Sequence, residues 1–285
     1  MMTPHRYLGL GQQGFHRIAY VEWGAPANPR VCICVHGLTR NGRDFDELAS
    51  ALQQNWRVLC PDVVGRGESD RLPDPTGYGY PQYLADMNAL IARAGTARVD
   101  WVGTSMGGLI GMMLAAQPNT PIRRLVINDI GPFIPRAGLE RIAGYVGKDP
   151  RFASLAEAEA ALRRTAATFG LKTDDEWRRF TERSTRPLAE GQYALAYDPG
   201  IAKPFAGQPQ KDIDLWAVWD KITCPVLVLR GADSDLLLKE TAEQMRQRGP
   251  GCTLVEFQGC GHAPALMDAA QTDVVRDWLM GEWQG

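Results

Sequence analysis

Short apolar runs alternate with longer amphipathic stretches along most of the chain. From residue 31 onward the runs are mostly apolar throughout, which is typical of strands buried on both faces. They are VCICV (31–35), RVLC (57–60), VDWVG (99–103), LVIND (125–129), VLVLR (226–230) and TLVEF (253–257). Between them lie helical stretches such as 80–94 and 105–117. This alternation predicts an α/β fold with right-handed crossovers and a mostly parallel sheet.

Two regions depart from this alternation. The runs between residues 7 and 23, which include IAYVEW (18–23), are less apolar, and we expect them to form an antiparallel edge hairpin. Between Pro132 and Trp219 no convincing strand is present. Helix starts are present there, because 154–157 and 173–176 both fit the capping box, and Gly170 fits a helix C-terminus. A mostly helical insertion between two core strands is the simplest interpretation.

Composition narrows the class of protein. The chain has 285 residues and a formal net charge of −2, so it lacks the basic balance that a nucleic-acid-binding surface requires. No run approaches the roughly 18 apolar residues of a membrane span. The first residues also lack the apolar core and small-residue cleavage site of a signal peptide. We expect a cytoplasmic protein, monomeric or a small homo-oligomer, that binds neither nucleic acid nor membrane.

Cysteine placement gives no sign of a disulfide scaffold or a metal site. Most of the six cysteines lie in or beside apolar runs, where a free thiol behaves as a small hydrophobic group. Cys32 and Cys34 would share one face of a buried strand with no histidine partner nearby, which favours core packing over metal binding. We expect no metal and no cofactor.

The most specific motif is Gly103-Thr-Ser105-Met-Gly107-Gly108, which directly follows one predicted strand and precedes a predicted helix. A G-x-S-x-G sequence in this context is typical of a nucleophile elbow, a strained turn that lifts the serine hydroxyl clear of the sheet. Side chains two residues to either side of Ser105 would collide in that turn, and Gly103 and Gly107 remove them. Ser105 is therefore the predicted nucleophile.

A serine nucleophile needs a base, and the chain has four histidines. His5 and His16 lie in the polar N-terminal region, and His36 is assigned below to substrate binding. His262 lies in the glycine-rich sequence GCGHAP (259–264), just after the last predicted strand. Active-site residues of open α/β sheets collect at such carboxyl ends of strands. His262 is the predicted base.

A carboxylate should orient the imidazole and stabilise its charged form. Three aspartates lie between Ser105 and His262 and follow a predicted strand. Asp129 follows LVIN, and Asp233 and Asp235 follow VLVLR. Spacing alone does not separate Asp235 from Asp233, and Asp129 ranks third.

A second backbone donor for an oxyanion should come from an early strand-to-helix loop, and the sequence VHGLT (35–39) fits. There the N–H group of Leu38 would act together with that of Met106. His36, Gly37 and Thr39 are predicted to contact substrate. The glycine-rich loop 61–69 lacks the G-x-x-x-x-G-K-[ST] pattern, so a rigid structural loop is favoured over a phosphate cradle.

Taken together, these motifs resemble those of α/β-hydrolase-fold enzymes. The matching sequences, in the family's order, are HG (36–37), D-x-x-G-x-G-x-S (62–69), GTSMGG (103–108), an acid after the penultimate strand, and GCGHAP (259–264). The resemblance implies an eight-stranded sheet with a helical cap inserted after the sixth strand. The core would span 1–131 and 220–285, and the cap 132–219.

The same resemblance bears on the acid. The sequences NDIGP (128–132), YDPGIA (197–202) and RGADSDLL (230–237) resemble a bacterial subgroup of capped esterases and lactonases in which the Ser-Asp pair after the strand supplies the acid, which favours Asp235. Many relatives place the acid three residues after the strand-end glycine, where this chain has Ser234. That offset keeps Asp233 as the alternative.

The predicted reaction is hydrolysis of a small or medium acyl ester or a lactone through an acyl-enzyme. Serine at position 105 argues against epoxide hydrolases and haloalkane dehalogenases of this fold, whose nucleophile is a carboxylate. Carbon–carbon bond hydrolysis of dienone acids is the nearest alternative, and cofactor-free, haloperoxidase-like activity is a lesser one. A non-catalytic ligand receptor is disfavoured because residues for all three triad positions are present.

Overall fold

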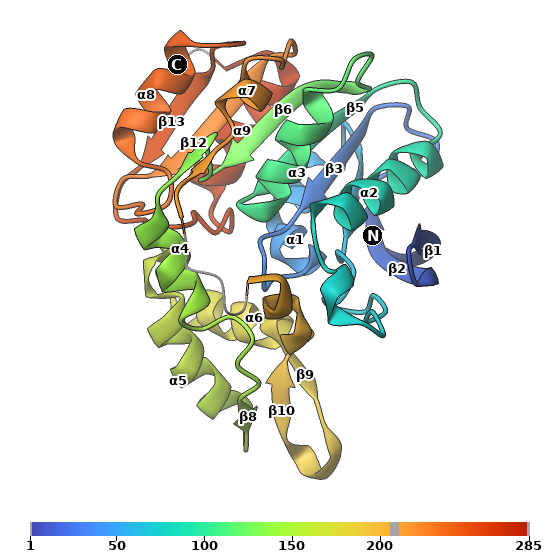
Figure 1. Cartoon of the computed structure of the whole chain (residues 1–285), viewed down its shortest axis with the longest axis vertical. Coiled ribbons are helices and arrows are strands. Elements are labelled where there is room, and N and C mark those ends of the chain that lie inside the picture. Colours follow the sequence, from blue (N-terminus) through green and yellow to red (C-terminus); the bar gives the residue numbers. More distant parts are fainter. Residues whose placement is uncertain (1, 206–210, 284–285) are drawn as a thin grey trace.

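A computed structural model describes residues 2–205 and 211–283. An eight-stranded sheet runs through the molecule in the order β1-β2-β4-β3-β5-β6-β12-β13 (Figure 1). Strand β1 pairs antiparallel with β2, and β2 pairs antiparallel with β4, whereas the remaining neighbours are parallel. The mostly parallel sheet and the antiparallel edge hairpin are thus confirmed. The strands are β1 (Thr3–Gly11), β2 (Gly14–Trp23), β3 (Val31–Val35), β4 (Arg57–Pro61), β5 (Val99–Thr104), β6 (Ile122–Asn128), β12 (Val226–Gly231) and β13 (Thr253–Phe257).

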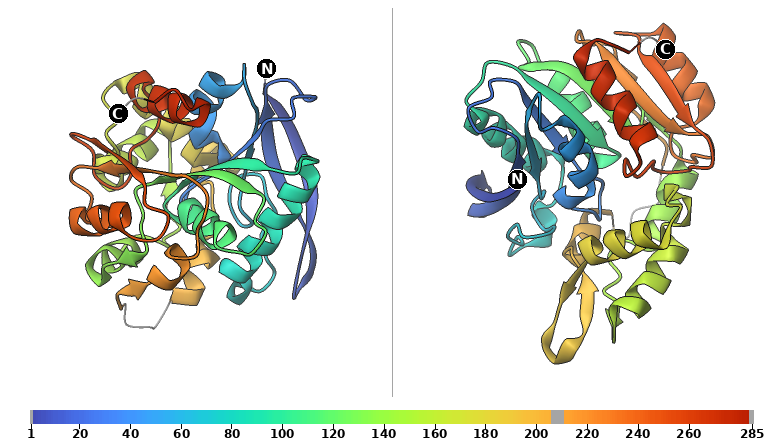
Figure 2. Two further views of the ribbon diagram at one scale, coloured as in Figure 1. Left: turned by 90° about the horizontal axis from the view of Figure 1, so that it is seen from above. Right: turned by 180° about the vertical axis from the view of Figure 1, so that it is seen from behind.

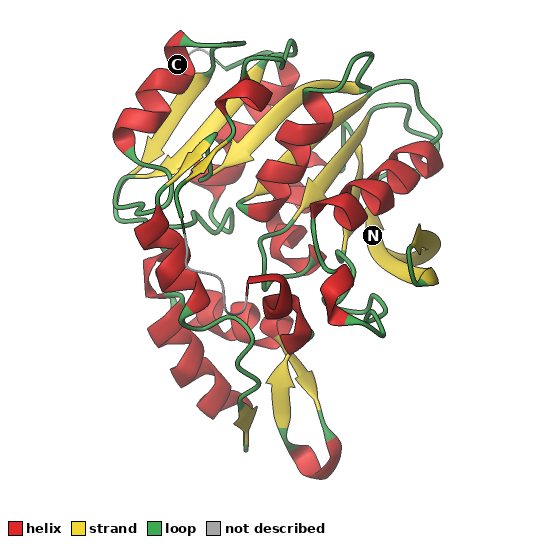
Figure 3. Cartoon of the chain, in the orientation of Figure 1, coloured by secondary structure: helices red, strands yellow, loops and turns green. Residues whose placement is uncertain are grey.

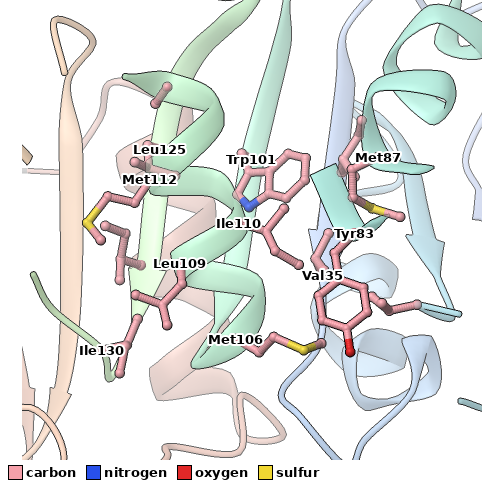
Figure 4. Packing of buried hydrophobic residues seen from close by; sticks show 14 of the residues in the cluster. Val35, Tyr83, Met87, Trp101, Met106, Leu109, Ile110, Met112, Leu125 and Ile130 are labelled. Atoms are coloured by element: carbon pink, nitrogen blue, oxygen red, sulfur yellow. The ribbon is translucent and has the colours of Figure 1, made fainter. Parts of the chain in front are cut away.

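Helices cover both faces of this sheet (Figure 2). Alternate residues of each central strand point to opposite faces, so two apolar layers form. In β3, Ile33 and Val35 belong to the layer under α2 (Tyr80–Ala94) and α3 (Met106–Ala115). Figure 4 shows this layer around Trp101, with α3 side chains packed against the strands. Helices α7 (Trp216–Trp219) and α8 (Lys239–Gln247) also pack into it.

The opposite layer lies under α1 (Asp46–Leu52) and α9 (Ala269–Met280). Cys32 and Cys34 belong to it, are fully buried, and place their sulfur atoms 3.9 Å apart without a disulfide. Their predicted role in core packing is confirmed. The described part of the chain also contains short 3₁₀ helices, which are η1 (Gly42–Phe45), η2 (Pro75–Gly77), η3 (Ala167–Phe169), η4 (Ala189–Gly191) and η5 (Pro199–Phe205).

The chain between β6 and β12 adds no strand to the eight-stranded sheet. Its main helices are α4 (Arg136–Ala143), α5 (Leu155–Thr165) and α6 (Asp174–Ser184). The predicted helix starts are confirmed, because Ser154 accepts a hydrogen bond from the Glu157 N–H and Thr173 forms a complete capping box with Glu176. These caps satisfy backbone donors that the first helical turn leaves without partners.

The expectation that this region contains no strands is wrong. Strands β8 (Arg151–Phe152), β9 (Thr185–Pro187) and β10 (Tyr193–Leu195) form a small sheet, and β7 (Phe133–Ile134) pairs with β11 (Ile213–Asp214) (Figure 3). Segments of two or three residues are too short to show an alternating pattern, so the sequence gives little sign of them. The division into a core and a cap spanning 132–219 stays a prediction.

Polar contacts fasten this region to the rest of the molecule near the site described next. Arg183 of α6 forms an ion pair with Glu47 of α1 at 2.8 Å, and the Asn41 side chain donates to the Arg183 carbonyl at 2.6 Å. Arg141 of α4 pairs with Asp235 at 2.5 Å. Within the described residues, no helix is long and apolar enough to cross a membrane.

Candidate active site

Ser105 occupies a sharp turn between β5 and α3. Its backbone has φ 51° and ψ −114°, a conformation that side-chain-bearing residues rarely adopt. A Cβ atom on Gly103 would lie 2.2 Å from the Gly107 carbonyl oxygen, and one on Gly107 would lie 1.9 Å from the Val35 carbonyl oxygen. The chain can therefore make this turn only with glycine at both positions, as the sequence predicts.

His262 lies in the loop after β13, and its Nε2 atom is 3.0 Å from the Ser105 hydroxyl oxygen. The structure thus brings the predicted nucleophile and base together. Two contacts hold the loop in place. The Asn128 side chain at the end of β6 donates to the Pro264 carbonyl at 2.8 Å, and the Gly261 N–H donates to the Thr168 carbonyl at 2.6 Å.

The carboxylate beside His262 belongs to Asp129, not to Asp235. Asp129 follows β6 and is fully buried, and its Oδ2 atom lies 2.8 Å from His262 Nδ1. The Gly231 N–H donates to its Oδ1 atom at 2.7 Å, and the Ser234 hydroxyl donates to Oδ2 at 2.6 Å. Three donors therefore satisfy this buried carboxylate, as burial of a charge requires.

The predictions of Asp235, and of Asp233 as its alternative, are wrong. Both side chains are exposed. Asp235 instead forms a bidentate ion pair with Arg141, at 2.5 and 2.8 Å. Partial burial raises the pKa of Asp235, but hydrogen bonds and charge from Arg141 outweigh it, and the net shift is downward. Asp235 thus helps to fasten α4 to the sheet.

Ser234 accounts for the difference between the predicted and the observed position of the carboxylate. It occupies the position at which the resemblance places the carboxylate, and it donates its hydroxyl proton to Asp129 from there. Strands β6 and β12 are neighbours, so the ends of both strands reach the same imidazole. In the sequence, Asp129 was the third-ranked candidate because it directly follows a buried strand. Only the pairing of β6 with β12 shows that Asp129 is the one that reaches His262.

His36 does not contact the cavity beside Ser105, and the prediction that it binds substrate is wrong. Its ring is fully buried, its Nε2 atom accepts the Val63 N–H at 2.9 Å, and its Nδ1 atom lies 2.7 Å from the Gly37 carbonyl oxygen. Because Nε2 accepts, Nδ1 carries the proton and the ring is neutral. Burial lowers the pKa of His36 to about 3, which agrees with this state.

The ring of His36 orients the predicted oxyanion donor. The Gly37 carbonyl accepts from His36 and from the Arg40 N–H at 3.1 Å. In a trans peptide the N–H points opposite to the carbonyl, so these contacts fix the direction of the Leu38 N–H. The Met106 N–H belongs to the first turn of α3, where backbone donors have no acceptor within the helix. The role of both groups as oxyanion donors stays a prediction.

Arg66 is a residue that the sequence interpretation passed over. Its side chain is 1% exposed and makes no ion pair with any residue that the structure describes. Its Nε atom donates to the Leu38 carbonyl at 2.8 Å, and an Nη atom lies 3.7 Å from the Met106 sulfur. Arg66 thus connects the two residues predicted to supply oxyanion donors. Its sequence signal is slight, since an arginine in a polar loop is ordinarily exposed.

The rest of loop 61–69 is held by hydrogen bonds within the chain. Asp62 accepts the Gly42 N–H at 2.7 Å and the Glu68 N–H at 2.8 Å, and burial raises its pKa to about 6. A Cβ atom on Gly67 would lie 2.1 Å from this carboxylate. The backbone N–H groups therefore face a carboxylate of the chain itself, which agrees with the predicted structural role.

A cavity of about 60 Å³ lies beside Ser105 and His262. Gly37, Leu38 and Thr39 line one side, which places Gly37 and Thr39 where the sequence predicts substrate contact. Aromatic side chains from the 132–219 region line the other side. A larger open groove of about 1100 Å³ lies between the N-terminal hairpin and α6, and neither Ser105 nor His262 lines it.

The fold, with Ser105, His262 and Asp129 in contact at the carboxyl ends of its strands, is that of an α/β hydrolase. The chain belongs to the alpha/beta hydrolase family, whose sequence model matches residues 32–277. It is 48% identical over 280 residues to a 3-hydroxybutyrate-oligomer hydrolase from Cupriavidus necator, covering 95% of this chain and 96% of the relative.

Two further similarities are weaker in sequence. An alpha/beta hydrolase from Novosphingobium aromaticivorans has a crystal structure that covers 98% of both chains with a TM-score of 0.87 at 38% identity. A 2-hydroxy-6-oxo-2,4-heptadienoate hydrolase from Pseudomonas putida is 28% identical over 221 residues, covering 74% of this chain and 73% of the relative. The predicted fold and family are confirmed.

Proposed function

We propose that the protein is a serine hydrolase of carboxylic esters, in which Ser105 is the nucleophile, His262 the base and Asp129 the acid. The observation that carries this proposal is the chain of contacts from Ser105 Oγ to His262 Nε2 at 3.0 Å and from His262 Nδ1 to Asp129 at 2.8 Å. The first contact couples a nucleophile to a general base, and the second fixes the tautomer that leaves Nε2 free to accept a proton.

In the first half of the reaction, His262 Nε2 takes the hydroxyl proton as Ser105 Oγ bonds to the carbonyl carbon of the ester. Negative charge develops on the carbonyl oxygen, where the N–H groups of Leu38 and Met106 would stabilise it. The carbon–oxygen bond to the leaving group then breaks, and His262 returns the proton to the departing alcohol. The acyl group stays on Ser105.

In the second half, water gives a proton to His262 and its oxygen bonds to the acyl carbon. The bond to Ser105 breaks, the serine regains the proton and the free acid departs. Asp129 stabilises the imidazolium in both halves. Its location in a fully buried position keeps this interaction out of water, where it would be weaker.

For the substrate, we propose short esters of hydroxy acids, with 3-hydroxybutyrate oligomers as the first choice. The support is the similarity to the Cupriavidus necator relative, which extends over 95% of this chain. A narrow cavity next to Ser105, lined partly by aromatic side chains, suits a small aliphatic acyl group.

Carbon–carbon bond hydrolysis is the second candidate, because the Pseudomonas putida relative is a hydrolase of a dienoate. The same serine, histidine and aspartate could serve that reaction. The lower identity, 28% against 48%, makes the ester the first choice.

The test is turnover of p-nitrophenyl butyrate, a 3-hydroxybutyrate dimer and a dienone acid by wild type and Ser105→Ala. We expect both esters to be hydrolysed, with activity lost in Ser105→Ala, and a fluorophosphonate to label Ser105 in wild type. Turnover of the dienone acid alone would establish the second candidate. Absence of turnover of all three substrates, together with absence of labelling, would contradict both proposed reactions.

A further inference from the structure

A second cavity, of about 140 Å³, adjoins the one beside Ser105. The two cavities share five lining residues, Thr39, Arg40, Tyr145, Phe169 and Phe180. The remaining walls come from the 132–219 region, chiefly from α5 and from the residues around β8 and β10. The second cavity is therefore the direct neighbour of the one at Ser105.

Most of the second cavity is apolar, and its charge lies toward solvent. Phe152, Leu162 and Ala166 are buried and line its interior. Lys148 also lines it but is exposed, so Lys148 marks the end that opens to water. The cavity thus combines an aliphatic interior with a cation at its mouth.

The charge of Lys148 has no partner in the part of the chain that the structure describes, since Lys148 forms no ion pair there. The neighbouring Asp149 is paired with Arg151. Arg40, the other cation in the cavity wall, is already neutralised by Asp44 at 2.5 and 2.9 Å and stacks on Phe180. Lys148 is consequently the lining cation that is available to an anionic ligand.

We propose that the second cavity binds the carboxyl-terminal part of a hydroxy-acid oligomer, and that Lys148 binds its terminal carboxylate. This inference rests on the proposed ester hydrolase function and adds a preference for substrates that end in a free acid. The acyl side of the ester bonds to Ser105, and the departing hydroxy acid occupies the second cavity.

Size agrees with this assignment. A cavity needs about 10–15 Å³ to hold one water-sized group. The cavity of about 140 Å³ therefore accommodates about ten non-hydrogen atoms. A 3-hydroxybutyrate unit has about six or seven, and its methyl group and methylene suit the apolar interior. One unit therefore fits within the cavity with its carboxylate toward the mouth, whereas two units would exceed the space.

The test compares the 3-hydroxybutyrate dimer and trimer as free acids with their methyl esters, in wild type and Lys148→Met. The methionine keeps the apolar stem and removes the charge. We expect the ratio of KM for the acids to KM for the methyl esters to be about fivefold higher in Lys148→Met than in wild type. This is the effect typical of an ion pair that solvent reaches. In wild type, the preference for the acids should weaken at high salt. Lys221→Met, at an exposed lysine that lines neither cavity, is the matched control and should keep the wild-type ratio.

An unchanged ratio in Lys148→Met would overturn the proposal, as would an equal rise in KM for acids and methyl esters, which would indicate lost packing instead of lost charge. A second variant, Ala161→Trp, fills the cavity and should raise KM for the trimer more than for p-nitrophenyl acetate. An equal change for both esters would also contradict the proposal. If wild type hydrolyses p-nitrophenyl butyrate but no oligomer, the oligomer proposal fails while the serine hydrolase stands.

Discussion

Asp129 and Asp235 both follow buried strands, yet their surroundings differ in every respect that matters for a triad. Asp129 is enclosed, faces His262 and is satisfied by three donors. Asp235 is half exposed and paired with an arginine. An exposed, paired carboxylate stabilises an imidazolium poorly, because water and the arginine screen it. The proposal of Asp129 as the acid therefore rests on burial and contact, which residue type alone does not reveal.

Arg66 should matter for kcat although it lies outside the cavity. Arg66→Met removes the donor that holds the Leu38 carbonyl, so the loop carrying the Leu38 N–H loosens. A shift of about 1 Å in such a donor can cost about 10²-fold in rate. We expect kcat on p-nitrophenyl butyrate to fall by about that factor, with a small change in KM.

Arg66→Lys should recover part of the lost kcat, because lysine can still donate to the Leu38 carbonyl. A variant Arg66→Met with wild-type kcat and a folded far-ultraviolet circular dichroism spectrum would contradict this positioning role.

His36 should make stability fall on acidification. Its pKa is about 3 in the folded protein, against an ordinary 6.5, so between these values the unfolded chain binds a proton that the folded protein does not. The contribution of His36 is fully present above about pH 6.5 and is lost as pH falls toward 3. We expect the free energy of unfolding to decline less steeply from pH 7 to about pH 5 in His36→Gln than in wild type, measured by urea denaturation.

Asp62 acts in the opposite direction, since its folded pKa of about 6 lies above the ordinary 3.8, and its contribution is lost as pH rises between these values. Because wild type and His36→Gln share Asp62, the difference between their profiles isolates His36. Parallel profiles would mean that His36 is not the neutral buried group described above.

Among the elements, the turn between β5 and α3 is the most tightly determined. Gly103→Ala places a methyl group about 2.2 Å from the Gly107 carbonyl oxygen. The methyl carbon is bonded to the backbone and the oxygen is a backbone atom, so neither can rotate away. The turn must open, which displaces Ser105 from His262. We expect loss of fluorophosphonate labelling and a destabilisation of about 2 kcal/mol or more.

Gly259→Ala is a suitable control for labelling. That glycine lies in the loop that carries His262, and open space surrounds its Cβ position, although its φ of 69° adds backbone strain. We expect Gly259→Ala to retain labelling. Labelling of Gly103→Ala at the wild-type level would show that the turn tolerates a side chain.

The elements themselves could be predicted largely from the sequence. The central strands are continuous apolar runs, α2 has buried residues at helical spacing, and the starts of α5 and α6 carry capping residues, so each signal is local. The short strands β7 to β11 escaped prediction because they are two or three residues long and depend on partners far along the chain. Local signals therefore predicted the core better than the insertion.

At the scale of the whole molecule, the candidate site was predictable where one motif carries one role. Ser105 and His262 each stand in a distinctive glycine-rich sequence. The acid was not predictable in this way, because Asp129 reaches His262 only through the pairing of β6 with β12. His36 was misassigned for a similar reason, since its burial depends on the fold of loop 61–69 over it.

Contacts between the 132–219 region and the rest of the molecule should contribute to stability. Arg183→Met removes two hydrogen bonds to Glu47, at 2.8 and 3.0 Å, in a partly buried setting. We expect the free energy of unfolding to fall by about 1–2 kcal/mol, measured by urea denaturation.

Arg178→Met is the matched control on the same helix, since Arg178 is exposed and, among the described residues, pairs only with Asp175 one turn away. Its removal should cost less than about 0.5 kcal/mol. Equal losses in the two variants would mean that the contact of α6 with α1 adds nothing to stability.

The most direct test of the account is the rate of ester hydrolysis by Asp129→Asn and Asp235→Asn, measured as kcat on p-nitrophenyl butyrate. Asparagine at 129 keeps the size of the side chain but favours the wrong tautomer of His262, and loss of a triad acid in this way typically lowers kcat by about 10⁴-fold. We predict a loss of that order for Asp129→Asn and a change of less than about tenfold for Asp235→Asn, whose carboxylate contacts Arg141 instead of His262. Near-wild-type kcat in Asp129→Asn, or an equally large loss in Asp235→Asn, would contradict the assignment of Asp129 as the acid.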